Sequence, residues 1–100
     1  MPIVETARFE TPHGSKYLQQ LCKHLAHKIS VEYDDRKGSA ALPTGPASLT
    51  ADEAALLVEI SAEDEAGLER ARHIIDHHLK RFAFREAFDG MDWKRANSAT

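Results

Sequence analysis

The sequence predicts an α+β fold of two layers, in which an antiparallel sheet carries two helices on one of its faces. Two stretches repeat apolar residues every three or four positions, which is typical of amphipathic helices. Five other stretches alternate apolar and polar residues or are rich in β-branched ones, which is typical of strands. Short connections between strands favour antiparallel pairing. With 100 residues, 42% of them hydrophobic, the chain has material for one core.

The first part of the chain predicts a strand, a helix and a second strand. Residues 3–9 carry β-branched residues in rough alternation and predict the first strand. Residues 16–28 predict the helix, with Ser15 or Thr11 available as its N-cap. Residues 30–35 alternate again and predict the second strand. The apolar stripe of the helix consists of Leu18, Leu21, Cys22, Leu25 and Ile29.

Three more strands follow. The first passes through Ala40 and Leu42, the second covers residues 47–50, and residues 43–46 (Pro-Thr-Gly-Pro) form the turn between them. Residues 55–61 form the clearest strand of the chain, because aliphatic residues at every second position share one face.

A long second helix completes the fold. Ser61 to Asp64 match the capping-box pattern, and the acidic residues 63–65 favour a helix N-terminus. The helix is predicted to run to about Glu86, with basic residues near its C-terminal end. Its apolar stripe consists of Leu68, Ala71, Ile75, Leu79, Phe82 and Ala83.

The resulting order, β-α-β-β-β-β-α, resembles the arrangement of TATA-box-binding-protein-like folds. We expect one α+β domain over residues 1–95 and a disordered tail over residues 96–100. Cys22 cannot form an internal disulfide, and its place in the apolar stripe predicts a buried thiol with a raised pKa. Residues 1–5 show no secretory signal and no apolar run approaches the length of a membrane span. We therefore expect a cytoplasmic protein without membrane contact.

Two separated motifs carry a family resemblance. The first is Tyr-Leu-Gln-Gln-Leu-Cys-Lys-His-Leu-Ala-His-Lys at residues 17–28. The second is His-His-Leu-Lys-Arg-Phe-Ala-Phe-Arg-Glu at residues 77–86, followed by Trp93. Together they resemble a small bacterial family, the domain of unknown function 2218, over nearly the whole chain. The resemblance implies a small uncharacterised α+β protein, and it associates such domains with iron and siderophore uptake.

Five of the six histidines lie on the two predicted helices. His73 and His77 are four residues apart and share a helix face, so they could hold Zn²⁺, Fe²⁺, Cu²⁺ or haem. If the helices pack side by side, His24 or His27 supplies a third ligand. One hypothesis is therefore an iron-related metal- or haem-binding protein. The alternative is that these histidines are surface side chains with no cofactor, because His73 and His77 lie opposite the apolar stripe.

A group of aromatic and basic residues near the end of the chain gives a second hypothesis. Phe82 belongs to the apolar stripe, whereas Phe84 points nearly opposite to it. Phe84 and Trp93, flanked by Arg81 and Arg85, would suit an anionic and partly aromatic ligand or a self-association surface. The alternative is that the residues following Phe84 fold back over it as an intramolecular lid.

The formal charge of −3 averages two unlike parts of the chain. Residues 30–69 hold ten acidic and two basic side chains, whereas residues 70–85 hold five basic side chains and one acidic. Residues 11–28 hold three lysines and no acid. The helices are therefore basic and favour an anion site, while an acidic sheet face argues against nucleic acid.

These observations favour a non-catalytic module that binds a small anionic ligand or acts as an accessory protein. No set of catalytic residues stands out, so enzymatic activity is not expected. The alternatives are a metal- or haem-binding protein using His24, His27, His73 and His77, and an enzyme of unassigned reaction. Leu57, expected on the outer face of the sheet, and Phe84 favour a homodimer.

Overall fold

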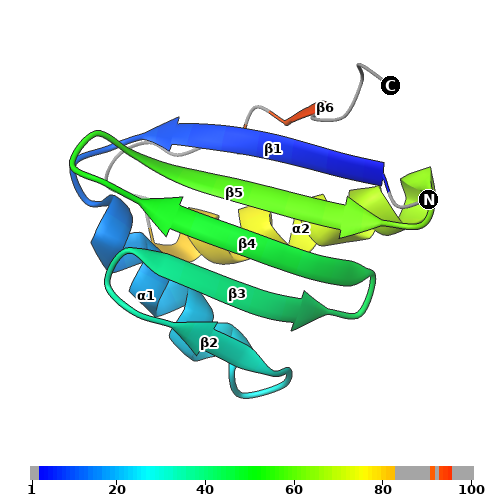
Figure 1. The fold of residues 1–100 in the computed structure, drawn as a ribbon, viewed down its shortest axis with the longest axis horizontal. Coiled ribbons are helices and arrows are strands. Elements are labelled where there is room, and N and C mark those ends of the chain that lie inside the picture. The colour runs from blue at the N-terminus through cyan, green and yellow to red at the C-terminus, as the bar shows by residue number, and fades with distance from the viewer. Residues whose placement is uncertain (1–2, 83–90, 92, 96–100) are drawn as a thin grey trace.

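A computed structural model describes residues 3–82, 91 and 93–95, and it confirms the predicted two-layer α+β fold (Figure 1). An antiparallel sheet forms one layer, and both helices lie behind it in the view of Figure 1. The elements in chain order are β1 (Ile3–Glu10), α1 (Gly14–Leu25), β2 (Val31–Tyr33), β3 (Lys37–Leu42), β4 (Gly45–Ala51), β5 (Ala55–Ala62), α2 (Glu65–Phe82) and β6 (Lys94–Arg95). The predicted tail, residues 96–100, lies outside the described residues, and the single domain over residues 1–95 stays a prediction.

The strand order is β2-β3-β4-β5-β1-β6, and every neighbouring pair is antiparallel. Strands β2 to β5 follow one another as a meander, whereas β1 lies between β5 and β6. The sequence did not predict β6, which pairs Arg95 with Glu5 and Lys94 with Thr6. Its two residues are too few to show an alternating pattern.

The core fills the space between the sheet and the helices. Leu49 on β4 pairs with Val58 on β5, and both side chains are 1% exposed on the helix-facing side. Leu68 and Ile75 of α2 are fully buried, and each such side chain contributes about 1.5–3 kcal/mol through removal from water. The predicted apolar faces of both helices and of β5 are therefore confirmed.

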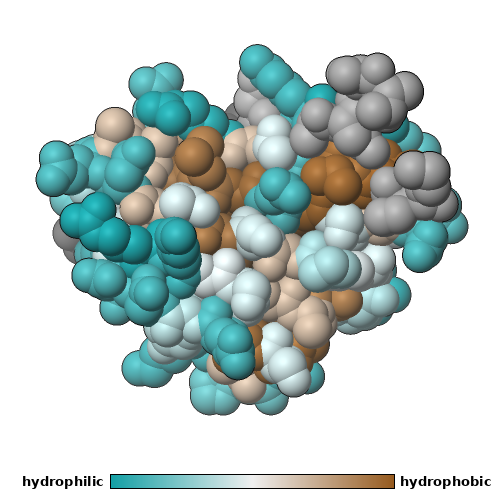
Figure 2. Space-filling model, viewed as in Figure 1, coloured by the Kyte–Doolittle hydropathy of each residue, from teal (hydrophilic) through white to brown (hydrophobic). Residues whose placement is uncertain are grey.

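The outer face of the sheet carries small and polar side chains. Figure 2 shows this face, with residues of intermediate hydropathy across its middle, hydrophobic ones toward the upper left and the right, and hydrophilic ones around the rim. Leu57 lies on it and is 39% exposed, as the alternation within β5 requires. The homodimer expected from Leu57 stays a prediction. Among the described residues, neither helix is long and apolar enough to span a membrane.

The start of α1 differs from the prediction. The helix begins at Gly14, two residues earlier than expected, and no side chain caps it. Thr11 accepts a hydrogen bond from the backbone N–H of His13 (3.1 Å), and the hydroxyl of Ser15 donates to the carbonyl of Asp35 (2.5 Å). Both predicted N-caps are therefore wrong, because each side chain has a nearer partner in a loop.

The start of α2 also differs in detail. Asp64 accepts a hydrogen bond from the N–H of Gly67 (2.8 Å) and so caps the helix. Ser61, the predicted capping residue, is still in β5, and its hydroxyl donates to the carbonyl of Pro46 on β4 (2.8 Å). The helix is described as far as Phe82, and residues 83–90 lie outside the described part of the chain.

The buried carboxylate of Glu5, on the first strand, forms ion pairs with α2 and with the last strand. Glu5 faces the helices from β1 and is 5% exposed. Arg72 of α2 donates two hydrogen bonds to its carboxylate, from Nε (2.6 Å) and Nη2 (2.9 Å), and Arg95 of β6 donates a third from Nε (3.4 Å). Arg95 also pairs with Glu65. The hydrogen bond with Arg72 contributes most to holding the pKa of Glu5 below its ordinary value.

Asp76 of α2 fixes the chain just before β6. Its carboxylate accepts a hydrogen bond from the backbone N–H of Met91 (3.0 Å) and another from the indole N–H of Trp93 (3.2 Å). Met91 is 9% exposed, and Trp93 packs against the core. These contacts hold Met91 and Trp93 against α2 and the core. Phe84, which the predicted lid would cover, lies outside the described residues.

Replacing Asp76 by Ala is expected to destabilise the protein by about 2–3 kcal/mol, because two partly buried donors lose a charged acceptor. Urea unfolding followed by Trp93 fluorescence measures the change. Glu69→Ala, an exposed change on the same helix, is the matched control and should stay within about 0.5 kcal/mol of the parent. Equal stabilities of the two variants would contradict the role of Asp76.

Candidate functional site: a basic groove between the helices

A groove of about 710 Å³ opens between the end of α1, the middle of α2 and the turn that joins β3 to β4. Helices α1 and α2 contact each other beside it, behind the sheet in Figure 1. It is lined by His24, Leu25, His27, Lys28, Ile29, Leu42, Pro43, Arg70, Ile74, His77, His78 and Arg81.

The described side chains with a fixed charge in the lining of this groove are all positive. Lys28, Arg70 and Arg81 carry fixed positive charges, four further lining residues are histidines, and among the described residues no carboxylate lines the groove. The α2 residues among them recur at steps of three and four, so the helix presents them on one face. The acidic side chain Asp76 is on another flank of α2, where it bonds Met91 and Trp93. The groove therefore attracts anions.

The histidines converge at one end of the groove. The ring of His24 lies 5.4 Å from that of His78 and 5.5 Å from that of Phe82, measured between centroids. His77 and His78 are 5.7 Å apart. The Nδ1 of His78 donates to the carbonyl of Ile74 (2.7 Å), which leaves its Nε2 as the nitrogen free to meet a ligand. We call His24, His77, His78 and Arg81 the histidine end.

The pKa of His24 reports the positive surroundings. It lies below the ordinary value for histidine, first because the ring loses water and then because His78, Arg81, His27 and Lys28 oppose a further positive charge. A bound anion would remove this repulsion. The histidine end is therefore suited to a negatively charged group.

The remaining lining is aliphatic. Leu25 and Leu42 are buried, whereas Ile29 and Ile74 are only partly buried and Pro43 is exposed. Ile74 follows Arg70 by one turn of α2 and precedes His77 and His78 by another. An apolar strip therefore runs beside the histidine end, and a ligand there can cover hydrocarbon as well as charge.

The structure places three of the four predicted metal ligands in the groove and the fourth outside its lining. His24, His27 and His77 line the groove, whereas His73 does not and stacks against His77 at 5.7 Å. Within residues 3–82, 91 and 93–95, no three histidine, cysteine, aspartate or glutamate side chains gather closely enough to hold a metal ion. The metal and haem hypothesis is left with pairs of histidines and stays a prediction.

The predicted ligand residues are also divided. Arg81 lines the groove, but Trp93 bonds Asp76. Asp76 and Arg81 are five residues apart, which places them about 140° apart around the helix axis. The structure therefore does not bring Arg81 and Trp93 together, and Phe84 and Arg85 lie outside the described residues.

Sequence reasoning missed three groove residues: Lys28, Arg70 and His78. Arg70 is seven residues before His77, so the two share a helix face, and that spacing was the available signal. His78 is partly buried and bonds the carbonyl of Ile74. Its place beside His24 depends on how the helices pack, which the sequence does not show.

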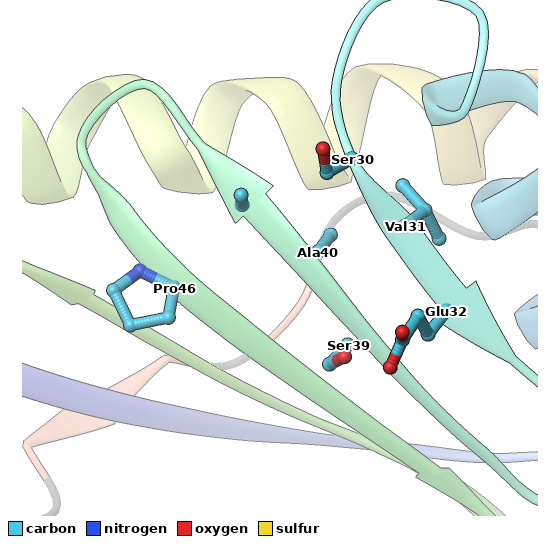
Figure 3. A pocket seen from close by; sticks show the side chains of 7 residues that line it. Ser30, Val31, Glu32, Ser39, Ala40 and Pro46 are labelled. Carbon is cyan, nitrogen blue, oxygen red and sulfur yellow. The ribbon is translucent and has the colours of Figure 1, made fainter.

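Cys22 and the outer sheet face offer less chemistry. The predicted burial of Cys22 is confirmed, and it raises the pKa of the thiol to about 11. A shallow depression of about 480 Å³ lies over β2, β3 and β4 (Figure 3). It is lined by Ser30, Val31, Glu32, Ser39, Ala40, Ala41 and Pro46. It has one carboxylate and no basic side chain, so it lacks the charge of the groove.

The fold and the groove define a small two-layer α+β protein with a basic cleft between its two helices. The chain belongs to a family of uncharacterised proteins conserved in bacteria, the domain of unknown function 2218, whose model matches residues 6–94. This confirms the family resemblance of the two motifs. A solution NMR structure, that of PA4090 from Pseudomonas aeruginosa, is similar with a TM-score of 0.77 and 27% identity, and the match covers 96% of this chain and 99% of that one. No curated protein matches the chain.

Proposed function

We propose that the protein is a non-catalytic module that binds a small anionic ligand in the groove between α1 and α2. The observation that carries the proposal is the composition of the lining, which in the described part of the chain has three fixed cations, four histidines and no carboxylate. The predicted basic character of the helices supports it as well.

The geometry supports ligand binding more than catalysis. Arg81 and Lys28 can each donate hydrogen bonds to an anion, and a guanidinium can donate two in parallel. The exposed ring of His24 can add a further N–H donor. Within the described residues, the groove has no acid to act beside these histidines, and the one thiol is buried outside it.

Calorimetry with phenyl phosphate and with inorganic phosphate tests the proposal. Phenyl phosphate is expected to bind with a Kd below about 1 mM, and Arg81→Gln and Lys28→Gln are each expected to weaken it by about tenfold, the loss of one charged hydrogen bond. Lys23→Gln is the matched control, because Lys23 is an exposed residue of α1 that does not line the groove. Its affinity should equal that of the parent.

Two outcomes would overturn the proposal. One is the absence of binding by either phosphate, and the other is an equal loss of affinity in Lys23→Gln and Lys28→Gln. A titration with Zn²⁺ alone tests the metal alternative in the same instrument. Binding of Zn²⁺ tighter than about 10 µM that is lost in His77→Ala, together with no phosphate binding, would favour that alternative.

A further inference from the structure

We infer that the ligand of the groove is an amphipathic anion, with a negatively charged head at the histidine end and a hydrocarbon part over Ile74 and Ile29. This inference rests on the proposed anion-binding function and adds the chemical class of the ligand. Its basis is the division of one groove into a charged end and an aliphatic strip.

The position of the head follows from the packing of the two helices. His24 of α1 and His78 of α2 have their rings 5.4 Å apart, and Arg81 lies one turn of helix beyond His78. The bond from His78 to the carbonyl of Ile74 fixes the orientation of its ring. An anion at this point meets donors from both helices, and Lys28, in the turn after α1, adds a positive charge that acts on His24. Arg70 lies two turns before His77 on α2.

The position of the hydrocarbon part follows from incomplete burial. Ile29 and Ile74 pack against the core but keep part of their surface open to the groove, and Pro43 extends this surface from the β3–β4 turn. Ile74 lies seven residues before Arg81, which is about 10.5 Å along the axis of α2. A ligand with its head at Arg81 therefore needs a chain of several carbons to cover Ile74.

The length of the chain is thus an experimental variable. A series of acetate, butanoate, hexanoate and octanoate keeps the head constant and changes only the hydrocarbon. Each added methylene that covers the strip is expected to tighten binding by about fourfold. A hydrated surface site for anions would bind all four equally.

The test compares the parent with Ile74→Thr and Arg81→Gln, by calorimetry or by NMR shifts of the groove residues. Ile74→Thr is expected to reduce the gain per methylene while leaving acetate unchanged, and Arg81→Gln is expected to weaken all four acids by the same factor. Leu57→Thr, on the exposed outer face, is the matched control and should not change the series. Ile29→Thr replaces Ile74→Thr if the latter fails to fold.

The outcomes separate this inference from the proposed function. Binding of phenyl phosphate with no dependence of carboxylate affinity on chain length would overturn the amphipathic ligand and leave the anion site. A dependence on chain length that is the same in Ile74→Thr and in the parent would place the hydrocarbon elsewhere and would also overturn the inference. Absence of binding by every anion would overturn the proposed function itself.

Discussion

Replacing Glu5 by Gln is expected to destabilise the protein by about 3 kcal/mol, the largest loss we expect from removing one charge. The carboxylate is 5% exposed and accepts hydrogen bonds from Arg72 and Arg95. A glutamine amide keeps the shape but not the charge, and it presents an N–H₂ group to one of these donors. The two guanidinium groups then lose their buried acid and share the exposed Glu65.

The same substitution is expected to change the response to acid. Because the folded protein holds the pKa of Glu5 below its ordinary value, the carboxylate stabilises the fold above pH about 4.5, and this stabilisation is lost as the pH falls through the lower, folded value. Unfolding free energies from urea titrations at several pH values between about 3 and 7 measure it. The difference between parent and Glu5→Gln should shrink as the pH falls.

Glu59→Gln provides the matched control. Glu59 is on the neighbouring strand β5 but points to the exposed outer face. The substitution removes the same charge without removing a buried bond, so a change within about 0.5 kcal/mol is expected. A difference between parent and Glu5→Gln that stays constant down to pH 3 would contradict the ion pair as its source.

Replacing Gly45 by Ala is expected to cost about 3 kcal/mol or more. Gly45 begins β4 with a φ of 148°, a conformation that side chains disfavour. A Cβ atom there would also lie 2.6 Å from the carbonyl oxygen of Ser61 on β5. Both backbones belong to the sheet, so neither can move away cheaply.

Thermal unfolding measures this effect. For a chain of this size, about 3 kcal/mol lowers the Tm by roughly 12–24 °C. Ser48→Ala, on the exposed face of the same strand, is the matched control and should leave the Tm nearly unchanged. A Gly45→Ala protein with the Tm of the parent would show that the sheet tolerates a side chain at this position.

The fold could be predicted because its elements are long enough to show their periodicity. In β5, alternate residues face the helices, and in α2 the buried Leu68, Ile75 and Leu79 recur along one side. Burial of an apolar face is the dominant stabilising effect, so the pattern that reports it also determines the two layers. The family motifs extend over the same elements.

The helix starts and the last strand could not be predicted in the same way. Ser61 and Asp64 both fit the pattern of a cap, and the choice between them depends on where β5 ends, which is a property of the sheet. Strand β6 consists only of Lys94 and Arg95. It is held by its pairing with β1 and by the hydrogen bond from Arg95 to Glu5, and it has no apolar pattern. Such contacts join residues far apart in the chain.

The positive charge of the candidate site was predicted from the sequence, but the full set of residues that form it was not. The excess of lysine, arginine and histidine on the helices indicated an anion site on the helical side. Which of these residues meet depends on the packing of α1 on α2, so His24 was joined with His73 in the sequence interpretation and with His78 in the structure. Trp93 was wrongly grouped with Arg81, because the hydrogen bond that holds Trp93 against Asp76 cannot be recognised from the sequence.

The position of β1 in the sheet determines when this strand can pair with its neighbours during synthesis. Strand β1 leaves the ribosome first, but both of its neighbours, β5 and β6, are made later, and the bond from Arg95 to Glu5 spans 90 residues. Strands β2 to β5 pair with sequence neighbours and can form as they emerge. Strand β1 is therefore made before the other strands of this sheet but is among the last to find its partners, and a chain that still lacks β5 exposes the half-apolar β1 to other molecules.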